Sequence, residues 1–230
     1  MNEPWTEKYR PKTISDYVFQ NEEERHLVEY WVKNKDIPHI LLSGSAGTGK
    51  TTLAKVLINE LGIDEYDILY SNGSKEGRKV EWVDKLINFC STMPFGKFKV
   101  VLIDEADYMN PHSTQPALRN LMEDYYSSVR FILTCNYPNK IIPPLHSRCE
   151  QGKLHINKTD KVEFFGRVVT ILDRENVAFD AETLMQYVDA SYPDLRRCLN
   201  QVQKNSITGT LKKPAESDDP MQDWRLDCVR

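Results

Sequence analysis

The 230-residue sequence has no run of apolar residues long enough to span a bilayer. Its first twelve residues, MNEPWTEKYRPK, are polar and lack the apolar core of a secretory signal. The formal net charge of −4 gives no overall signal for nucleic acid, so binding DNA would require a local basic surface. We therefore expect a cytoplasmic protein that is neither secreted nor bound to a membrane.

Cysteine is scarce and scattered. The five residues form no C-x-x-C pair, which argues against a zinc site, and an odd, dispersed set indicates reduced thiols. The sequence also lacks internal repeats and long low-complexity segments, so an ordinary globular protein is expected. The cysteines are Cys90, Cys135, Cys149, Cys198 and Cys228.

One glycine-rich stretch carries the clearest motif. Residues 44–51 read GSAGTGKT, which matches G-x-x-x-x-G-K-[ST], and they lie between an apolar run and a helix-favouring run. In such a loop the backbone amides surround phosphate oxygens, Lys50 reaches the β- and γ-phosphates, and the Thr51 hydroxyl binds Mg²⁺. A glycine-rich turn with a chance lysine would not explain why strand, loop and helix agree. The predicted nucleotide-binding residues here are Gly44, Ser45, Ala46, Gly47, Thr48, Gly49, Lys50, Thr51 and Thr52.

Acidic residues end the apolar run at 98–105. In an open parallel sheet, ligands bind at the carboxyl ends of the strands, so these acids are expected near the phosphate loop. Asp104 would hold Mg²⁺, directly or through water, and Glu105 would polarise the attacking water. The alternative is a helix cap or a solvated loop acid. The presence of Lys50 and Thr51 favours the hydrolytic site.

Two weaker signals accompany these motifs. Asn136 follows the next strand, where its amide could orient water or contact the γ-phosphate, although an asparagine after a strand is more often a turn residue. Lys75, Arg78 and Lys79 form a small basic cluster at the start of a helix, which is either a solvated helix start or a contact for the DNA backbone.

The alternation of strands and helices predicts an α/β fold with a parallel five-stranded sheet flanked by helices, followed by a small helical domain. We expect an α/β nucleotide-binding domain over residues 1–156, a helical lid domain over 157–207 and a polar tail over 208–230. Trp5–Lys12 is expected to be an extended strap and Pro138–Pro144 a loop. The expected strands are His39–Ser43, Asp67–Tyr70, Phe98–Glu105, Val129–Thr134 and Lys153–Ile156. The expected helices are Asn21–Lys33, the run after the phosphate loop to Leu61, Val80–Ser91, Thr114–Tyr125, Asp160–Glu175 with Thr159 as its cap, Ala181–Ala190 and Asp194–Asn205.

The chain resembles the AAA+ clamp loaders, the replication factor C small subunits and their phage counterparts. The resemblance runs from about residue 5 to residue 203 and rests most on the opening Lys-Tyr-Arg-Pro and on Ser147-Arg148-Cys149. The motifs that carry it are Glu7–Pro11, the phosphate loop, Ser71–Ser74, Asp104–Asp107, Ala117–Arg119, Met122–Glu123, Cys135–Asn136, Ser147–Cys149 and Pro193–Asn200.

The resemblance implies an ATP hydrolase stimulated by DNA and clamp, with ATP and Mg²⁺ as cofactors. It makes Asn136 the first sensor of the γ-phosphate and Arg196, on the helical lid, the second sensor. Arg148 would be an arginine finger that acts on the ATP of a neighbouring subunit. Tyr9, Arg10 and Pro11 would lie near the adenine.

The resemblance also implies partners. These are the other subunits of a hetero- or homo-oligomeric ring, expected to be a pentamer, together with a sliding clamp and primer–template DNA. Gln115 and Arg119 would lie on the helix that couples ATP to DNA, with Lys75, Arg78 and Lys79 as further candidates for phosphate contacts.

The sequence departs from the family in three ways. The loop has no proline between its first two glycines, and Pro193 stands where glycine is more usual. Only about 25 residues follow the lid, so the collar domain is absent or shortened, and the compact motifs favour a bacteriophage source. The alternatives are another AAA+ remodeller or helicase-like motor, and a non-catalytic structural ring subunit; the intact Lys50, Thr51, Asp104 and Glu105 oppose the second.

Overall fold

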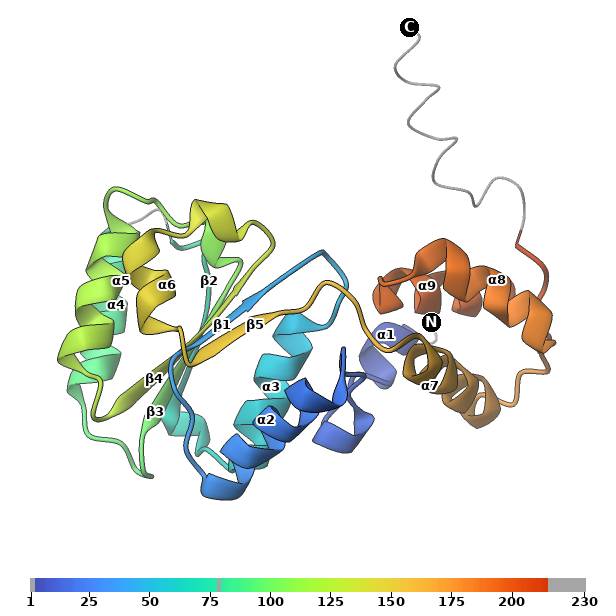
Figure 1. The fold of residues 1–230 in the computed structure, drawn as a ribbon, viewed down its shortest axis with the longest axis horizontal. Coiled ribbons are helices and arrows are strands. Elements are labelled where there is room, and N and C mark those ends of the chain that lie inside the picture. Colours follow the sequence, from blue (N-terminus) through green and yellow to red (C-terminus); the bar gives the residue numbers. More distant parts are fainter. Residues whose placement is uncertain (1–2, 78–79, 215–230) are drawn as a thin grey trace, which may run out of the picture. The chain divides into compact units, whose positions relative to one another are not determined.

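The computed structural model describes residues 3–77 and 80–214. It divides into two compact units (Figure 1), and each is described by itself. The larger unit comprises residues 11–157, and the smaller unit comprises residues 3–10 together with 158–214. Residues 3–10 therefore group with the helical part of the chain, whereas the sequence pattern assigned them to the α/β domain.

The larger unit is built on one sheet of five strands within the described residues, in the order β2-β3-β4-β1-β5. Every pairing is parallel, as the apolar runs predict. The carboxyl ends of all five strands therefore lie at one edge, which is where the predicted site residues follow their strands. The strands are β1 (Ile40–Ser43), β2 (Ile68–Asn72), β3 (Lys99–Asp104), β4 (Val129–Cys135) and β5 (Gly152–His155).

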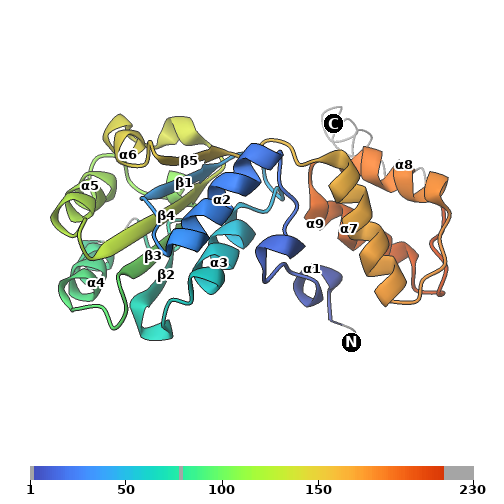
Figure 2. The same cartoon turned by 60° about the horizontal axis from the view of Figure 1, so that its bottom comes forward.

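Helices cover both faces of the sheet (Figures 1 and 2). On one face, α2 (Glu22–Asn34) and α3 (Lys50–Leu61) bury a core around Val28, Trp31 and Leu57. On the other face, α4 (Val80–Ser91), α5 (Thr114–Asp124) and α6 (Pro143–Arg148) bury a second core that includes Leu118 and Leu145. This two-layered core fixes the sheet edge on which the site is built.

One local prediction in this unit is wrong. Residues 138–144 are not a loop, because the short 3₁₀ turn η4 (Pro138–Lys140) is followed by α6, with a proline at its start where no amide donor is needed. Arg148 is consequently the last residue of a helix. Further 3₁₀ turns are η1 (Ile14–Asp16), η2 (Glu65–Asp67) and η3 (Ala106–Tyr108).

The smaller unit is helical, apart from one isolated bridge between Ala178 and Thr210 among its described residues. It contains α1 (Trp5–Lys8), which packs on α9, together with α7 (Lys161–Arg174), α8 (Ala181–Ser191) and α9 (Leu195–Asn205). The first half of the predicted strap is thus a helical turn in which buried Trp5 supplies the apolar contact, whereas residues 10–12 have no regular secondary structure. The cap of α7 is Asp160 and not Thr159, because the Asp160 carboxylate accepts the amides of Val162 and Glu163.

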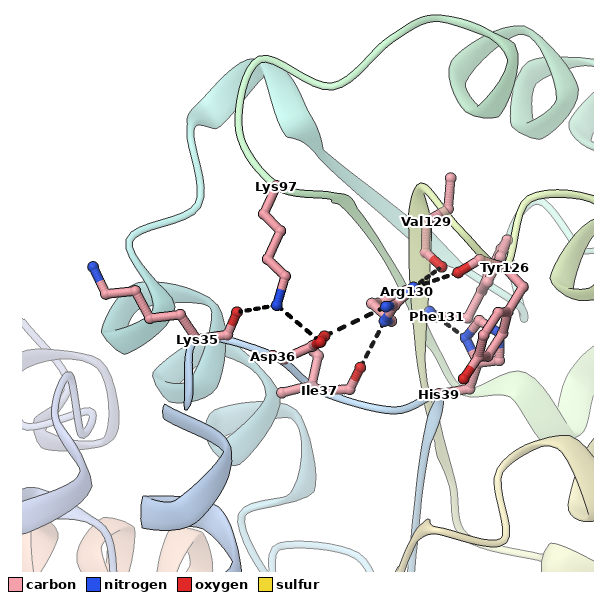
Figure 3. A network of polar contacts seen from close by, with 9 residues as sticks. All are labelled: Lys35, Asp36, Ile37, His39, Lys97, Tyr126, Val129, Arg130 and Phe131. Carbon is pink, nitrogen blue, oxygen red and sulfur yellow. Dashed lines mark hydrogen bonds and ion pairs between the residues drawn. The ribbon is translucent and has the colours of Figure 1, made fainter. Parts of the chain in front are cut away.

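A polar network surrounds Arg130 near the amino-terminal ends of the strands in the larger unit (Figure 3). Its guanidinium donates to the Ile37 carbonyl at 2.7 Å and lies 3.4 Å from Asp36, which Lys97 also approaches at 2.9 Å. Burial opposes ionisation of Asp36, but the two cations outweigh it and lower the pKa of that carboxyl. The network ties the segment before β1 to β3 and β4.

His39 lies beside this network (Figure 3) and is buried. Its Nδ1 accepts the Phe131 amide at 3.1 Å, so the ring proton is on Nε2, which faces the Met122 carbonyl at 3.3 Å. Burial lowers the pKa of His39 to about 4, and the neighbouring Arg130 and Arg148 act in the same direction. His39 is therefore a neutral core residue near pH 7.

Candidate active site

The glycine-rich loop leaves β1 and enters α3 as predicted. Gly44 has a φ of +143°, and a side chain there would overlap the backbone carbonyl of Ile156, just beyond β5. The Ile156 amide in turn donates to the Ser43 carbonyl at 2.7 Å. The loop is therefore packed directly against the chain that leaves the sheet, and only glycine fits at its first position.

Lys50 is buried at the start of α3. Its ammonium group donates to the carbonyls of Gly44 at 2.9 Å and Ser45 at 2.5 Å, so the side chain folds back over the loop. The Thr48 hydroxyl donates to the same Ser45 carbonyl at 2.9 Å. These contacts place one positive charge inside the curve of a loop whose amides begin a helix, and this is the arrangement that binds an anion.

The tip of β3 meets the loop through side-chain oxygens. The Thr51 hydroxyl donates to Asp104 Oδ1 at 2.7 Å, and Thr134, at the end of β4, donates to the same oxygen. Thr134 also accepts the Glu105 amide at 3.2 Å. One buried hydroxyl therefore holds both acids of the predicted pair. Thr134 was not predicted from the sequence, although its place at the end of the neighbouring strand was a usable signal.

Glu105 has a left-handed backbone conformation, with a φ of 55°. This conformation is unfavourable for a residue with a side chain, so it marks a locally constrained position. Its carbonyl lies so close to Gly73 that a Cβ on that glycine would come within 2.5 Å of it. The Gly73 amide donates to the Asp104 carbonyl at 2.7 Å. The end of β2 thus determines the turn that carries Glu105.

Asn136 is half-buried just beyond β4 and lies near the phosphate loop. It lines a cleft of about 380 Å³ together with the loop residues Gly44, Ser45 and Ala46. The remaining lining residues are Tyr137, His155 and Asn157. Asn136 and the loop therefore line one cleft, and the contact of the Asn136 amide with the γ-phosphate stays a prediction.

Asp107 is a buried acid to which the sequence pattern gave no role. Its Oδ2 accepts the amide of Tyr137 at 3.1 Å, and its Oδ1 is buried without a hydrogen-bond partner among the described residues. The contact fixes the backbone directly after Asn136. The last acid of the Asp104–Asp107 motif therefore supports the position of the predicted sensor.

Arg148 and Arg119 share an acidic neighbour. Arg148 Nη2 donates to Glu123 Oε2 at 2.6 Å and Nη1 donates to the Pro144 carbonyl at 3.1 Å, whereas Arg119 lies 3.8 Å from the same Glu123 oxygen. Cys149, which follows Arg148, is fully buried in the core below α5 and α6. The cysteine of the Ser-Arg-Cys motif is thus a packing residue.

All four described cysteines are free and buried. Burial raises the pKa of each thiol to about 12, so these groups are protonated near pH 7 and are poor nucleophiles. Cys228 lies outside the described residues. Within these same residues, no group of three or more His, Cys, Asp or Glu side chains could hold a metal ion.

Gln115 is completely buried at the start of α5. Its amide group donates to the carbonyls of Met109 at 3.1 Å and Lys140 at 3.0 Å, and its oxygen accepts the Ile142 amide at 2.8 Å. Ile142 is the residue that precedes α6. The predicted coupling residue therefore links three segments around the site.

The remaining residues predicted to bind or sense the nucleotide are found elsewhere. Among the described residues, no contact inside either unit brings them to the phosphate loop. In the smaller unit, the Tyr9 hydroxyl donates to Glu175 at 2.6 Å, Arg10 pairs with Glu7, and Arg196 is exposed on the first turn of α9. Pro11 begins the larger unit. Their roles at the nucleotide stay predictions.

Of the predicted DNA contacts, Lys75 is exposed on the turn after β2. This turn joins the start of α5, because the Thr114 hydroxyl donates to the Gly77 carbonyl at 2.7 Å. Arg119 is also exposed, on α5. Arg78 and Lys79 lie outside the described residues.

The residues fit the predicted ligands. The loop offers helix-start amides and Lys50 to a triphosphate, and Thr51 and Asp104 place two oxygens side by side that would hold Mg²⁺. None of the helices among the described residues is both long enough and apolar enough to cross a bilayer.

Comparison with known proteins agrees with this geometry. Residues 40–154 match the model for the ATPase family associated with various cellular activities (AAA). The chain is 38%, 40% and 39% identical to the Replication factor C small subunits of Picrophilus torridus, Sulfurisphaera tokodaii and Saccharolobus solfataricus, over 90%, 90% and 92% of its length. It covers 65%, 63% and 64% of those proteins and so spans less than two thirds of their length. These relatives are archaeal, and a bacteriophage source stays a prediction.

Solved structures agree on the fold. The Thermotoga maritima RuvB Holliday junction branch migration motor is 18% identical, with a TM-score of 0.72 over 91% of this chain and 70% of that one. A point mutant of the same RuvB gives a TM-score of 0.73 at 17% identity, over 92% of this chain and 71% of that one. At this identity the likeness concerns the fold alone.

Proposed function

This chain belongs to the ATPase family associated with various cellular activities (AAA), and we propose that it binds and hydrolyses ATP as one subunit of a replication clamp loader. The observation that carries the ATPase part is that Asp104, beside the phosphate loop, accepts from Thr51 and from Thr134, which in turn holds the Glu105 amide. The clamp-loader part rests on the 38–40% identity to Replication factor C small subunits.

In this proposal the loop amides and Lys50 hold the triphosphate, and Thr51 and Asp104 hold Mg²⁺, which would neutralise charge on the phosphates. Glu105 orients the attacking water and accepts its proton. Asn136, which lines the same cleft as the loop, would contact the γ-phosphate. The constrained backbone at Glu105 and the Asp107–Tyr137 contact keep these two groups in position without rearrangement.

Arg148 supplies the arginine finger to a neighbouring subunit. Positive charge delivered across an interface stabilises the transferring phosphoryl group and can accelerate hydrolysis by about 10³–10⁵-fold. This role is supported by the position of the half-buried Arg148 at the end of α6, where Glu123 and Pro144 hold its guanidinium. A site completed by a neighbour makes hydrolysis depend on assembly.

The partners in this proposal are the other subunits of a ring, a sliding clamp and primer–template DNA. ATP binding would assemble the ring, open the clamp and grip DNA through its phosphates, and hydrolysis would release the closed clamp. Lys75 and Arg119 are the described basic residues proposed to contact DNA. Tyr9, Arg10 and Pro11 are proposed to lie near the adenine, and Arg196 is proposed to report on the phosphates from a helical lid.

The alternative of a helicase-like motor has fold similarity in its favour, because RuvB shares the architecture. It predicts processive strand displacement, whereas a clamp loader shows none. A non-catalytic ring subunit would bind ATP without turning it over. The intact set of Lys50, Thr51, Asp104 and Glu105 favours turnover.

The decisive experiment measures ATP hydrolysis by the full chain across a range of protein concentrations, with and without primed DNA and a candidate clamp. The mass of each complex is measured in parallel. We expect the rate per chain to rise with assembly and to rise again when DNA and clamp are both present. A hydrolysis rate that does not change with DNA, clamp or protein concentration would contradict the clamp-loader proposal. An absence of turnover under every condition would contradict the ATPase proposal.

A further inference from the structure

Helix α5 holds α6 at both ends. Near its amino terminus, buried Gln115 accepts the amide of Ile142, the residue that precedes α6. Near its carboxyl terminus, Glu123 accepts a hydrogen bond from Arg148, the last residue of α6. Gln115, Arg119 and Glu123 are spaced by four residues, so they share one face of α5.

The contact at Arg148 leaves part of the guanidinium available. Nη2 donates to Glu123 at 2.6 Å and Nη1 donates to the Pro144 carbonyl at 3.1 Å, which uses two of the five N–H groups. The two acceptors lie on different helices and hold the planar group in one orientation. The other N–H groups remain able to donate to an anion.

Glu123 lies on an exposed part of α5 and, among the described residues, makes no hydrogen bond or ion pair with the phosphate loop. An exposed ion pair of this kind contributes little to folding. The ion pair matters more for orientation, because a long arginine side chain that is already oriented loses less rotational freedom when it binds its target. The pairing therefore suits a residue that must present a charge to a second molecule.

We propose that Glu123 is a positioning residue for Arg148 and orients the finger toward the nucleotide of the neighbouring subunit. This inference rests on the proposed function, since it assumes that Arg148 acts across an interface. Arg119, at 3.8 Å, is the weaker of the two partners of Glu123. Arg148 at 2.6 Å, with its second contact to Pro144, is the side chain that Glu123 fixes.

The first test compares Glu123→Ala and Glu123→Gln with the wild-type chain in the assembled, DNA-stimulated complex. For Glu123→Ala we expect kcat to fall roughly 10- to 100-fold, with KM for ATP within about twofold, because the nucleotide's own loop is untouched. Glu123→Gln should retain an intermediate rate, since its amide oxygen can still accept from Arg148. Glu150→Ala is the matched control, because it removes a carboxylate that pairs only loosely with Lys153, at 4.0 Å.

The second test mixes variants, so that a defect in the finger can be separated from a defect in the chain's own site. The Glu105→Gln chain keeps Arg148 but cannot hydrolyse ATP at its own nucleotide site. The Arg148→Ala chain keeps its own nucleotide site but lacks the arginine finger. Glu123→Ala should regain activity when mixed with Glu105→Gln, as Arg148→Ala should, and should give little activity when mixed with Arg148→Ala.

Three outcomes would overturn the inference: an unchanged kcat for Glu123→Ala, a raised kcat, which would make Glu123 an inhibitor of the finger, or activity in the mixture with Arg148→Ala. Normal hydrolysis by Arg148→Ala itself would overturn the trans step of the proposed function, and the positioning role with it. The two failures are distinguishable, because the first leaves Arg148→Ala defective and the second does not.

Discussion

The Thr51 hydroxyl donates a hydrogen bond to Asp104 at 2.7 Å, although the two residues are 53 positions apart in the sequence. The parallel sheet brings them together, because β1 and β3 both end at the edge where the loop and the acids lie. Two oxygens that suit Mg²⁺ are thus adjacent through topology alone. Substitutions around this pair can therefore test both the chemistry and the packing that keeps the two oxygens adjacent.

Replacing Glu105 with glutamine should separate binding from hydrolysis. The amide keeps the shape of the side chain but cannot accept a proton from water, so we expect ATP affinity within a few-fold of wild type and turnover reduced by at least about 100-fold. Fluorescent nucleotide titration and phosphate release measure the two quantities. Turnover near the wild-type rate would exclude Glu105 as the base.

Thr134→Val tests the hydroxyl that holds both acids. Valine preserves the volume but removes the donor to Asp104 and leaves the Glu105 amide without its acceptor. We expect kcat to fall about 10- to 100-fold, with a loss of about 1–3 kcal/mol in the free energy of unfolding. Thr134→Ser keeps the hydroxyl and should retain most activity. Equal rates for the two variants would contradict this role.

Gly44→Ala should prevent the phosphate loop from forming. The added Cβ would overlap the Ile156 carbonyl at a φ that residues with side chains avoid, so we expect loss of nucleotide binding and a destabilisation of more than about 2 kcal/mol. Gly166→Ala is the matched control, because this exposed glycine lies within α7 with open space around its Cβ. It should raise stability by about 0.5–1 kcal/mol. Urea unfolding of both variants provides the measurement.

His39 should make the stability of the larger unit depend on pH. Its folded pKa of about 4 is below the unfolded value of about 6.5, so its contribution is complete above pH 6.5 and declines as pH falls toward 4. The loss is up to about 3 kcal/mol over this window. The His39 ring resonances should stay in the neutral form at pH 5 by NMR, and His39→Gln should flatten the pH dependence of urea unfolding. A histidine that titrates near pH 6.5 in the folded chain would contradict the assignment.

The sequence was sufficient for the sheet and the phosphate loop, because apolar strands and a glycine-rich turn depend on local pattern. All five strands were placed within one or two residues. The pairing of Thr51 with Asp104 followed from a general rule about parallel sheets.

The errors occurred where tertiary contacts decide. Trp5 forms a helical turn because its ring is buried in the smaller unit, and no local signal indicates that contact. Pro143 and Pro144 suggested a loop, yet prolines are tolerated in the first turn of a helix such as α6. Thr134 and Asp107 were missed because their partners come from other strands and turns.

The close approach of Gly73 to the Glu105 carbonyl also limits how the chain can vary. Residues 73 and 105, which directly follow the neighbouring strands β2 and β3, cannot vary independently, since any side chain at 73 would displace the turn that carries the acid. A library that randomises residue 105 alone varies the catalytic side chain while the backbone of the turn stays the same. A library that randomises residue 73 changes that backbone and would lose activity without altering a single catalytic group.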